Sequence, residues 1–319
     1  MLELLKHNWR AAVLTALGTV VLALVPLYAS GYVLSLSLLL YANVALATAW
    51  SFFSGATRYI SLATASFFGI GIYVLAVAHV YVPVPVAIVA AGVVAFLVAL
   101  IVGLSTLRLR GVYFVVFTFG LTELIHQVVN WWEIKLNKTV ARYIFTDVSN
   151  VVICETLLAV ALVAIVGSWF VSQSRLGFAL RAIGEDETVA RHTGVNTTLV
   201  KVVCFALSAM VMGLVGAILA LRYPYVDSSI AFNNTWSFQV LIAALLGGPG
   251  RAWGPAVGAV PLVLLSEYLA GTFPHHFSIA LGLCFVVIVY FLPGGVTRLL
   301  LRLYHSWRTP RARKRAEAH

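Results

Sequence analysis

Long apolar runs separated by short polar segments constrain this chain more than any motif does. A helix needs roughly 20 apolar residues to cross the hydrocarbon core of a bilayer. The run at 238–250 is too short to cross alone, so we interpret it as a half-helix or part of a broken span. We expect about ten spans, with eight as the lower count, near residues 11–29, 31–50, 60–80, 84–106, 111–129, 151–172, 199–221, 238–250, 255–271 and 276–293. This pattern predicts an all-α polytopic membrane protein with broken or half helices.

Composition agrees that lipid is the solvent for much of the chain. Hydrophobic residues make up 61% of the sequence and charged residues only 10%, and the mean hydropathy is +0.98. A chain of 319 residues cannot bury that much apolar surface in a water-soluble core. We interpret the three widely separated cysteines as small apolar residues, because they show no metal-ligand spacing.

The positive charges predict how the chain is oriented in the membrane. With a cytoplasmic N-terminus, all but four of the 21 Lys and Arg residues fall in cytoplasmic segments. The exceptions are Lys135, Lys138, Arg142 and Arg222. We therefore expect a transmembrane domain over 1–298 and a basic cytoplasmic tail over 299–319, with both termini cytoplasmic. Binding of nucleic acid to the tail is the weaker interpretation, so no nucleic-acid partner is expected.

The first apolar run resembles a signal peptide in position. It is longer than the apolar region of a typical signal peptide, so we interpret it as a retained first span.

A charged segment at 174–198 lies between two runs that are each long enough to span. Leu176, Leu180 and Ile183 recur at helical spacing, which predicts an amphipathic helix over 176–192. Gly194 is placed to end it. Such a helix at the membrane surface has nothing of its own to pack against, so it needs a partner. A solvated cytoplasmic loop is the alternative on composition alone.

Two glycine-rich segments interrupt the apolar pattern. In 60–73, Gly69 and Gly71 are expected to interrupt the helix and to let backbone approach a neighbouring helix or a ligand. Simple helix packing is the competing interpretation there. The run at 245–259, LLGGPGRAWGPAVGA, must break at the membrane edge because it holds five glycines and two prolines. A phosphate-binding loop is disfavoured, since no GK[ST] sequence follows.

Two acidic residues fall inside predicted spans. A carboxylate within a span costs roughly 2.5–3.5 kcal/mol on insertion scales, so Glu123 and Glu267 must each face a polar partner or a cavity. His126 lies three residues after Glu123 and is its expected neighbour. Glu123 is interpreted either as a polar clamp between helices or as a residue that contacts substrate.

These segments resemble the permeases of ABC importers in the branched-chain amino-acid family, of the LivM type. The resemblance is carried by GFALRAI followed by EDE and GVNT in 177–197, by SFFGIGIY in 66–73, by RGVYF…TFGLTE in 110–123, and by LGGPGRAWGPAVGA in 246–259. It extends over about 58–298. The chain departs from the family where Ala63 and Thr64 replace a Gly-His pair. It also lacks the Thr-Gly-Gly-Pro-x-Gly run that the family commonly carries in the loop at 130–150.

The resemblance implies a transport subunit of a bacterial inner-membrane importer. Its partners would be a second related permease subunit, two ATPase subunits and a periplasmic substrate-binding protein. The sequence has no Walker A motif and no catalytic or metal-ligand cluster. We therefore expect no enzyme activity and no cofactor in this chain, with ATP and magnesium held by the partner ATPases.

The resemblance also assigns expected roles to individual residues. Coupling to the ATPase would involve Gly177, Arg181, Glu185, Asp186, Glu187 and Gly194. The translocation path, or the structure around it, would involve Phe68, Gly69, Gly71, Tyr113, Glu123, Gly247, Gly248, Gly250, Gly254 and Glu267.

The substrate stays open between branched-chain or related amino acids and, as an alternative, urea or short amides. A proton-coupled secondary transporter that uses Glu123, His126 and Glu267 is the rival from another class.

Overall fold

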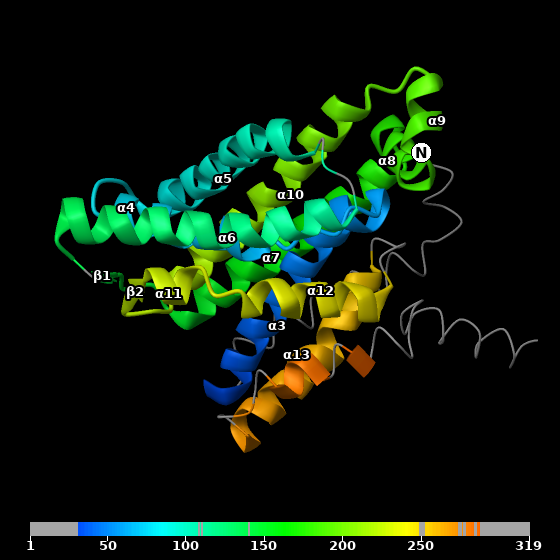
Figure 1. Ribbon diagram of the computed structural model, residues 1–319. Coiled ribbons are helices and arrows are strands. Elements are labelled where there is room, and N and C mark those ends of the chain that lie inside the picture. Colours follow the sequence, from blue (N-terminus) through cyan, green and yellow to red (C-terminus); the bar gives the residue numbers. More distant parts are fainter. Residues whose placement is uncertain are drawn as a thin grey trace, which may run out of the picture.

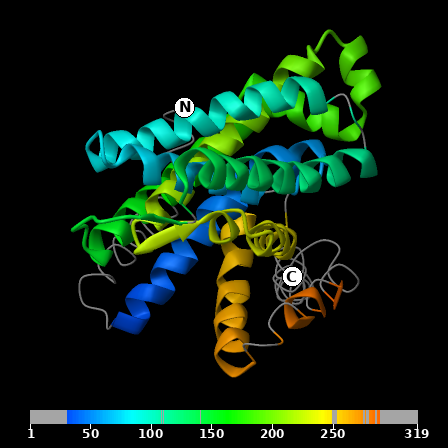
Figure 2. The ribbon, with the colours of Figure 1, turned by 60° about the vertical axis from the view of Figure 1, so that its left-hand side comes forward.

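Helices make up most of the chain that the structure describes. The computed structural model of the protein describes residues 31–107, 109, 111–139, 141–248 and 253–273, with short pieces at 276, 279–283 and 286–287. The helices cross one another at various angles and do not form a parallel bundle (Figure 1, Figure 2). The predicted spans at 11–29 and 276–293 lie wholly or mostly outside these residues, as does the basic tail.

Seven helical segments of the described residues are long and apolar enough to cross a membrane. The helix at 64–78 is apolar but shorter. The helices in chain order are α3 (Gly31–Trp50), η1 (Ser51–Gly55), α4 (Thr64–Ala78), α5 (Val84–Thr106), α6 (Val112–Trp132), η2 (Glu133–Asn137), α7 (Asn150–Ser172), α8 (Arg175–Glu185), α9 (Glu187–His192), α10 (Thr197–Ala220), α11 (Ser228–Ala231), α12 (Thr235–Gly247) and α13 (Gly254–Thr272). The predicted all-α membrane fold is confirmed, while the count of ten spans stays a prediction.

Helix α10 is the most buried span and packs against α5, α4 and α3. Small residues on α5 recur every fourth position, so they form one stripe that faces the core: Ala87, Ala91, Ala95, Ala99 and Gly103. Gly213 of α10 lies where a side chain would meet Ala91 and Ala95. The opposite side of α5 exposes large apolar residues, as expected of a lipid-facing surface.

The glycines of α4 support close backbone contact but do not interrupt the helix. A Cβ at Gly71 would meet the backbone of Gly213, and one at Gly69 would meet the ring of Phe232. The expected interruption at Gly69 and Gly71 was therefore wrong, because α4 continues through both. The absence of side chains lets α4 and α10 approach there. Phe68, also from this segment, is fully buried and packs against Trp236.

A short two-stranded sheet adds to the predicted all-α fold. Strand β1 (Ala141–Tyr143) pairs antiparallel with β2 (Tyr225–Asp227). A partly buried ion pair anchors β1 to the end of α6, because Arg142 Nε lies 2.6 Å from Glu133 Oε1. The sheet lies at the opposite end of the molecule from α8 and α9 (Figure 1, Figure 2).

Candidate functional site

The charged segment 174–198 folds as two helices at one end of the molecule (Figure 1). The single helix expected over 176–192 breaks at Asp186, whose backbone is extended. The Asp186 carboxylate accepts hydrogen bonds from the backbone N–H groups of Thr188 and Val189, at 2.7 and 3.1 Å. An aspartate with this geometry is a strong N-cap, so it starts a new helix, α9.

Gly194 ends α9, as the sequence predicted. Its φ is +87°, a conformation in which a side chain would be strained. The N–H of Gly194 donates to the carbonyl of Arg191, and the N–H of Val195 donates to that of Ala190. This paired pattern is the Schellman motif that commonly terminates helices.

Most of the predicted apolar face of α8 is covered by the chain itself, although Leu176 is 38% exposed. Leu180 and Ile183 are only 2% and 3% exposed. Gly177 is also buried, and a Cβ there would collide with the backbone of Val171 and Ser172 at the end of α7. The expectation that this helix has nothing of its own to pack against was therefore wrong. The neighbouring span ends, from α7 and α10, cover this face.

What α8 and α9 leave exposed is a mixed apolar and charged surface. The side chains of Phe178 and Val189 are 61% and 58% exposed. Arg181 lies over the ring of Phe178, with 4.7 Å from its guanidinium carbon to the ring centroid, and donates to the carbonyl of Ser172 at 3.0 Å. Glu185, four residues after Arg181 along the same helix, is also exposed. We call the set Phe178, Arg181, Glu185 and Val189 the α8–α9 surface.

Glu187 faces inward, unlike the other charged residues of this segment. Its side chain is 9% exposed and accepts hydrogen bonds from Lys201 at 2.8 Å and from the hydroxyl of Tyr59 at 2.6 Å. The role of Glu187 in coupling stays a prediction, and its carboxylate contacts Arg191 at 3.5 Å as well as Lys201 and Tyr59. Lys201 is one of the positive charges that predict a cytoplasmic location, and a lysine inside an apolar run also indicates a residue that needs a partner.

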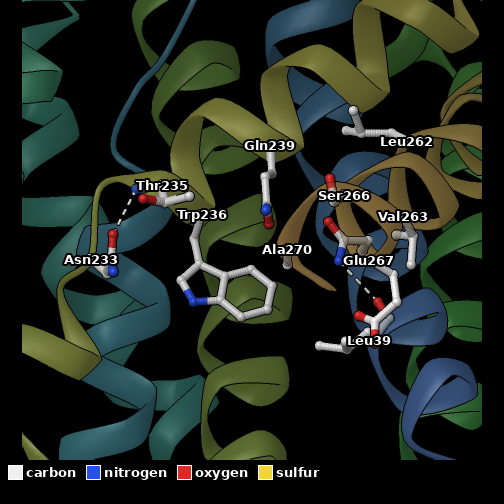
Figure 3. A pocket seen from close by; sticks show the side chains of 11 residues that line it. Leu39, Asn233, Thr235, Trp236, Gln239, Leu262, Val263, Ser266, Glu267 and Ala270 are labelled. Atoms are coloured by element: carbon white, nitrogen blue, oxygen red, sulfur yellow. Dashed lines mark hydrogen bonds between the residues drawn. The ribbon is translucent and has the colours of Figure 1, made fainter. Parts of the chain in front are cut away.

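A pocket of about 260 Å³ lies between α3, α12 and α13. Figure 3 shows Gln239 and Trp236 of α12 on one side and Ser266 and Glu267 of α13 on the other. Asn43 of α3 also lines it and donates to the carbonyl of Leu39. Glu267 thus has the cavity that its position in a span requires. Sequence reasoning missed Asn43 and Gln239, although both are polar residues within apolar runs.

Glu123 lies elsewhere, on an outward face of α6. Its side chain is 55% exposed, accepts a hydrogen bond from Gln127 at 2.6 Å and lies 3.6 Å from the imidazole of His126. Tyr113, near the start of the same helix, is 78% exposed. The expected polar neighbour of Glu123 is confirmed, and neither Glu123 nor His126 lines the pocket with Glu267.

The glycine-rich run breaks the chain between α12 and α13, as predicted. Helix α12 ends at Gly247, and Gly248 has a φ of +89°. A Cβ at Gly247 would collide with the backbone of Gly254, where α13 begins. Gly250 lies outside the described residues. The break sets α12 and α13 side by side, and both of them line the pocket.

Comparison with known proteins gives the family. The sequence model described as "Branched-chain amino acid transport system / permease component" matches residues 11–292. The chain belongs to this family. No solved structure matches it.

Individual proteins of the permease family are similar to this chain over part of its length. The chain is 28% identical over 252 residues to the LivM permease protein of a high-affinity branched-chain amino-acid transport system from Salmonella typhimurium, a match to 67% of this chain and 58% of that protein. It is 29% identical over 155 residues to LivH from Escherichia coli, covering 47% of each. It is 29% identical over 129 residues to BraD from Pseudomonas aeruginosa, covering 40% of this chain and 41% of that protein. The chain thus matches only 58% of the length of the LivM relative.

Proposed function

We propose that this chain is the membrane-spanning permease subunit of a bacterial ABC importer for branched-chain or related amino acids. The observation that carries the proposal is the α8–α9 surface, on a chain whose family is a transport permease. Its apolar residues are exposed although Leu180 and Ile183 beside them are buried, so they are available to a partner. An exposed aromatic residue with an adjacent arginine is typical of the residues that dominate protein interfaces.

The partner at that surface would be an ATPase subunit. Arg181 and Phe178 form a preorganised contact, which reduces the entropy lost when a partner binds. Glu185 adds a charge of the opposite sign, which gives specificity for a complementary cleft. ATP and magnesium would be held by that subunit.

The assembly would contain a second permease and a soluble binding protein. The relatives LivM and LivH carry the names of two different permease proteins of one kind of transport system, which supports pairing with a related subunit. Since α8–α9 and the β1–β2 sheet lie at opposite ends, a binding protein would meet the sheet end in the periplasm (Figure 1).

The pocket between α3, α12 and α13 would form part of the path for the substrate. Among the described residues, no hydrogen bond or ion pair joins Glu267 to another side chain, so its carboxylate is open to a ligand. An amino acid offers an ammonium group for Glu267, while Leu262 and Trp236 offer contact to an apolar side chain. Urea and short amides would meet the amide groups of Asn43 and Gln239 and form the alternative substrate class.

Reconstitution tests this function. The complete assembly, with its ATPases, second permease and binding protein, should accumulate labelled leucine in vesicles when ATP is supplied. Arg181→Glu should weaken ATPase co-purification by more than tenfold, since losing one side of an interfacial charge contact costs about 2–5 kcal/mol. Lys135→Glu is the control, because it reverses an exposed charge in η2, outside the α8–α9 surface.

Two results would contradict the proposal. One is uptake by vesicles that contain this chain alone with a proton gradient, which would establish the secondary transporter. The other is normal ATPase association in the Arg181→Glu variant.

A further inference from the structure

A buried polar cluster joins α9 to α10. Lys201 Nζ donates to Glu187 Oε1 at 2.8 Å, to the carbonyl of Leu107 at 2.9 Å and to the hydroxyl of Tyr59 at 3.4 Å. The Tyr59 hydroxyl in turn donates to Glu187 Oε2 at 2.6 Å. The Lys201 and Glu187 side chains are 3% and 9% exposed. We call Tyr59, Glu187 and Lys201 the junction.

The junction brings together segments that are far apart in the sequence. Tyr59 lies just before α4, and the Leu107 carbonyl lies just after α5. Lys201 lies in the first turns of α10, which packs against both α4 and α5. Glu187 is the first residue of α9, directly after the break at Asp186. A displacement of α9 therefore acts on the ends of three helices of the core through this one cluster.

The chemistry of the junction favours a role in holding α9 in one arrangement against α10 over a role in the stability of the fold. Burying two charges requires their desolvation, and replacing a buried ion pair by apolar residues of similar volume is often neutral or stabilising. An ion pair with several hydrogen bonds does, however, hold one arrangement, because each donor has a defined acceptor. The ring of Tyr59 adds to this, with Lys201 Nζ 4.7 Å from its centroid and Phe114 packed edge-on at 5.5 Å.

We propose that the junction transmits movement of α9 to α10 and the helices packed on it, so that Glu187, Lys201 and Tyr59 are positioning residues for coupling. The proposal rests on the proposed importer function, in which an ATPase docks on the α8–α9 surface and moves it. Glu187 then contributes to coupling from the inner side of α9, while the α8–α9 surface holds the ATPase on the outer side.

The test separates docking from transmission. In the reconstituted assembly, Glu187→Leu combined with Lys201→Met should leave ATPase co-purification and binding-protein-stimulated ATP hydrolysis within about twofold of wild type. Leucine uptake per ATP hydrolysed should fall about fivefold or more, the range of a typical coupling between sites. The matched control is Glu133→Leu with Arg142→Leu, which replaces a partly buried ion pair at the β1 end and should leave this ratio unchanged.

A second variant covers the case in which the double substitution does not fold. Tyr59→Phe removes one hydroxyl and keeps the ring, so it should lower uptake per ATP by a smaller factor with normal assembly. An unchanged ratio in the variants that fold would overturn the proposal. So would loss of ATPase association in step with uptake, because the junction would then only shape the docking surface. A wild-type assembly without ATP-driven uptake would instead contradict the importer function itself.

Discussion

Several charged residues of this protein are buried or line a pocket. Lys201 and Glu133 are each almost fully buried, and each has an oppositely charged partner. Glu267 has a pocket instead, with the amide side chains of Asn43 and Gln239 around it. Because a charge inside a membrane protein is costly without a partner or water, each such residue indicates a contact or a ligand.

The proposed path predicts an effect at Glu267. Glu267→Gln removes the charge that would bind a substrate ammonium group and keeps the shape of the pocket. A hydrogen bond to a charged group contributes about 1.5–3 kcal/mol, so the substrate concentration for half-maximal uptake should rise by about tenfold or more. Uptake kinetics in the reconstituted assembly measure this. Glu155→Gln, on the exposed side of α7, is the control, and equal kinetics in both variants would remove Glu267 from the path.

At the scale of elements, glycine and aspartate decide where helices break. Asp186 separates α8 from α9 by capping the second helix, and Gly248 separates α12 from α13 with a positive φ. Gly69 and Gly71 do not end a helix. Both have helical backbone, and their lack of side chains lets neighbouring segments come close. The same residue type thus ends one helix and packs another, depending on what lies beside it.

The close contact between α12 and α13 should not tolerate a larger side chain in place of glycine. A Cβ at Gly258 of α13 would collide with the Ala243 carbonyl and the Gly247 backbone of α12, whereas Gly167 of α7 has open space. Overpacking typically costs about 1–3 kcal/mol, so Gly258→Val should lower the thermal stability of the purified protein and impair transport. Gly167→Val should be tolerated. Comparable unfolding midpoints for the two variants would count against this packing.

For the whole molecule, the main feature is its two distinct ends. Helices α8 and α9 lie at one end and the β1–β2 sheet at the other (Figure 2). The positive charges of the sequence favour a cytoplasmic location for 174–198 and an external location for 130–150. Both observations fit an orientation in which α8 and α9 face the cytoplasm and the sheet faces the outside.

Cysteine labelling tests that orientation. With Cys154, Cys204 and Cys284 replaced, a single cysteine at Lys135 should react with a membrane-impermeant reagent added outside intact cells. A single cysteine at Glu185 should react only after the membrane is opened, because its segment would be cytoplasmic. The reverse pattern would overturn the orientation and, with it, the side assigned to the ATPase.

The sequence by itself determined the membrane class, most of the spans, a break within 245–259 and the helix end at Gly194. Each of these follows from local chemistry: the length of an apolar run, the conformation that glycine allows, or the cost of a charge in lipid. The resemblance also located the segment that contains the α8–α9 surface.

Only the tertiary structure decided which face of that segment is free. Leu180 and Ile183 have the spacing of a docking face, yet they pack on the span ends, and Glu187 turns inward to Lys201 and Tyr59. Periodicity tells which residues share a face, but not what covers it, since that depends on segments far away in the sequence. The pairing of Glu187 with Tyr59, 128 positions apart, is set by how α9, α10 and α4 pack together.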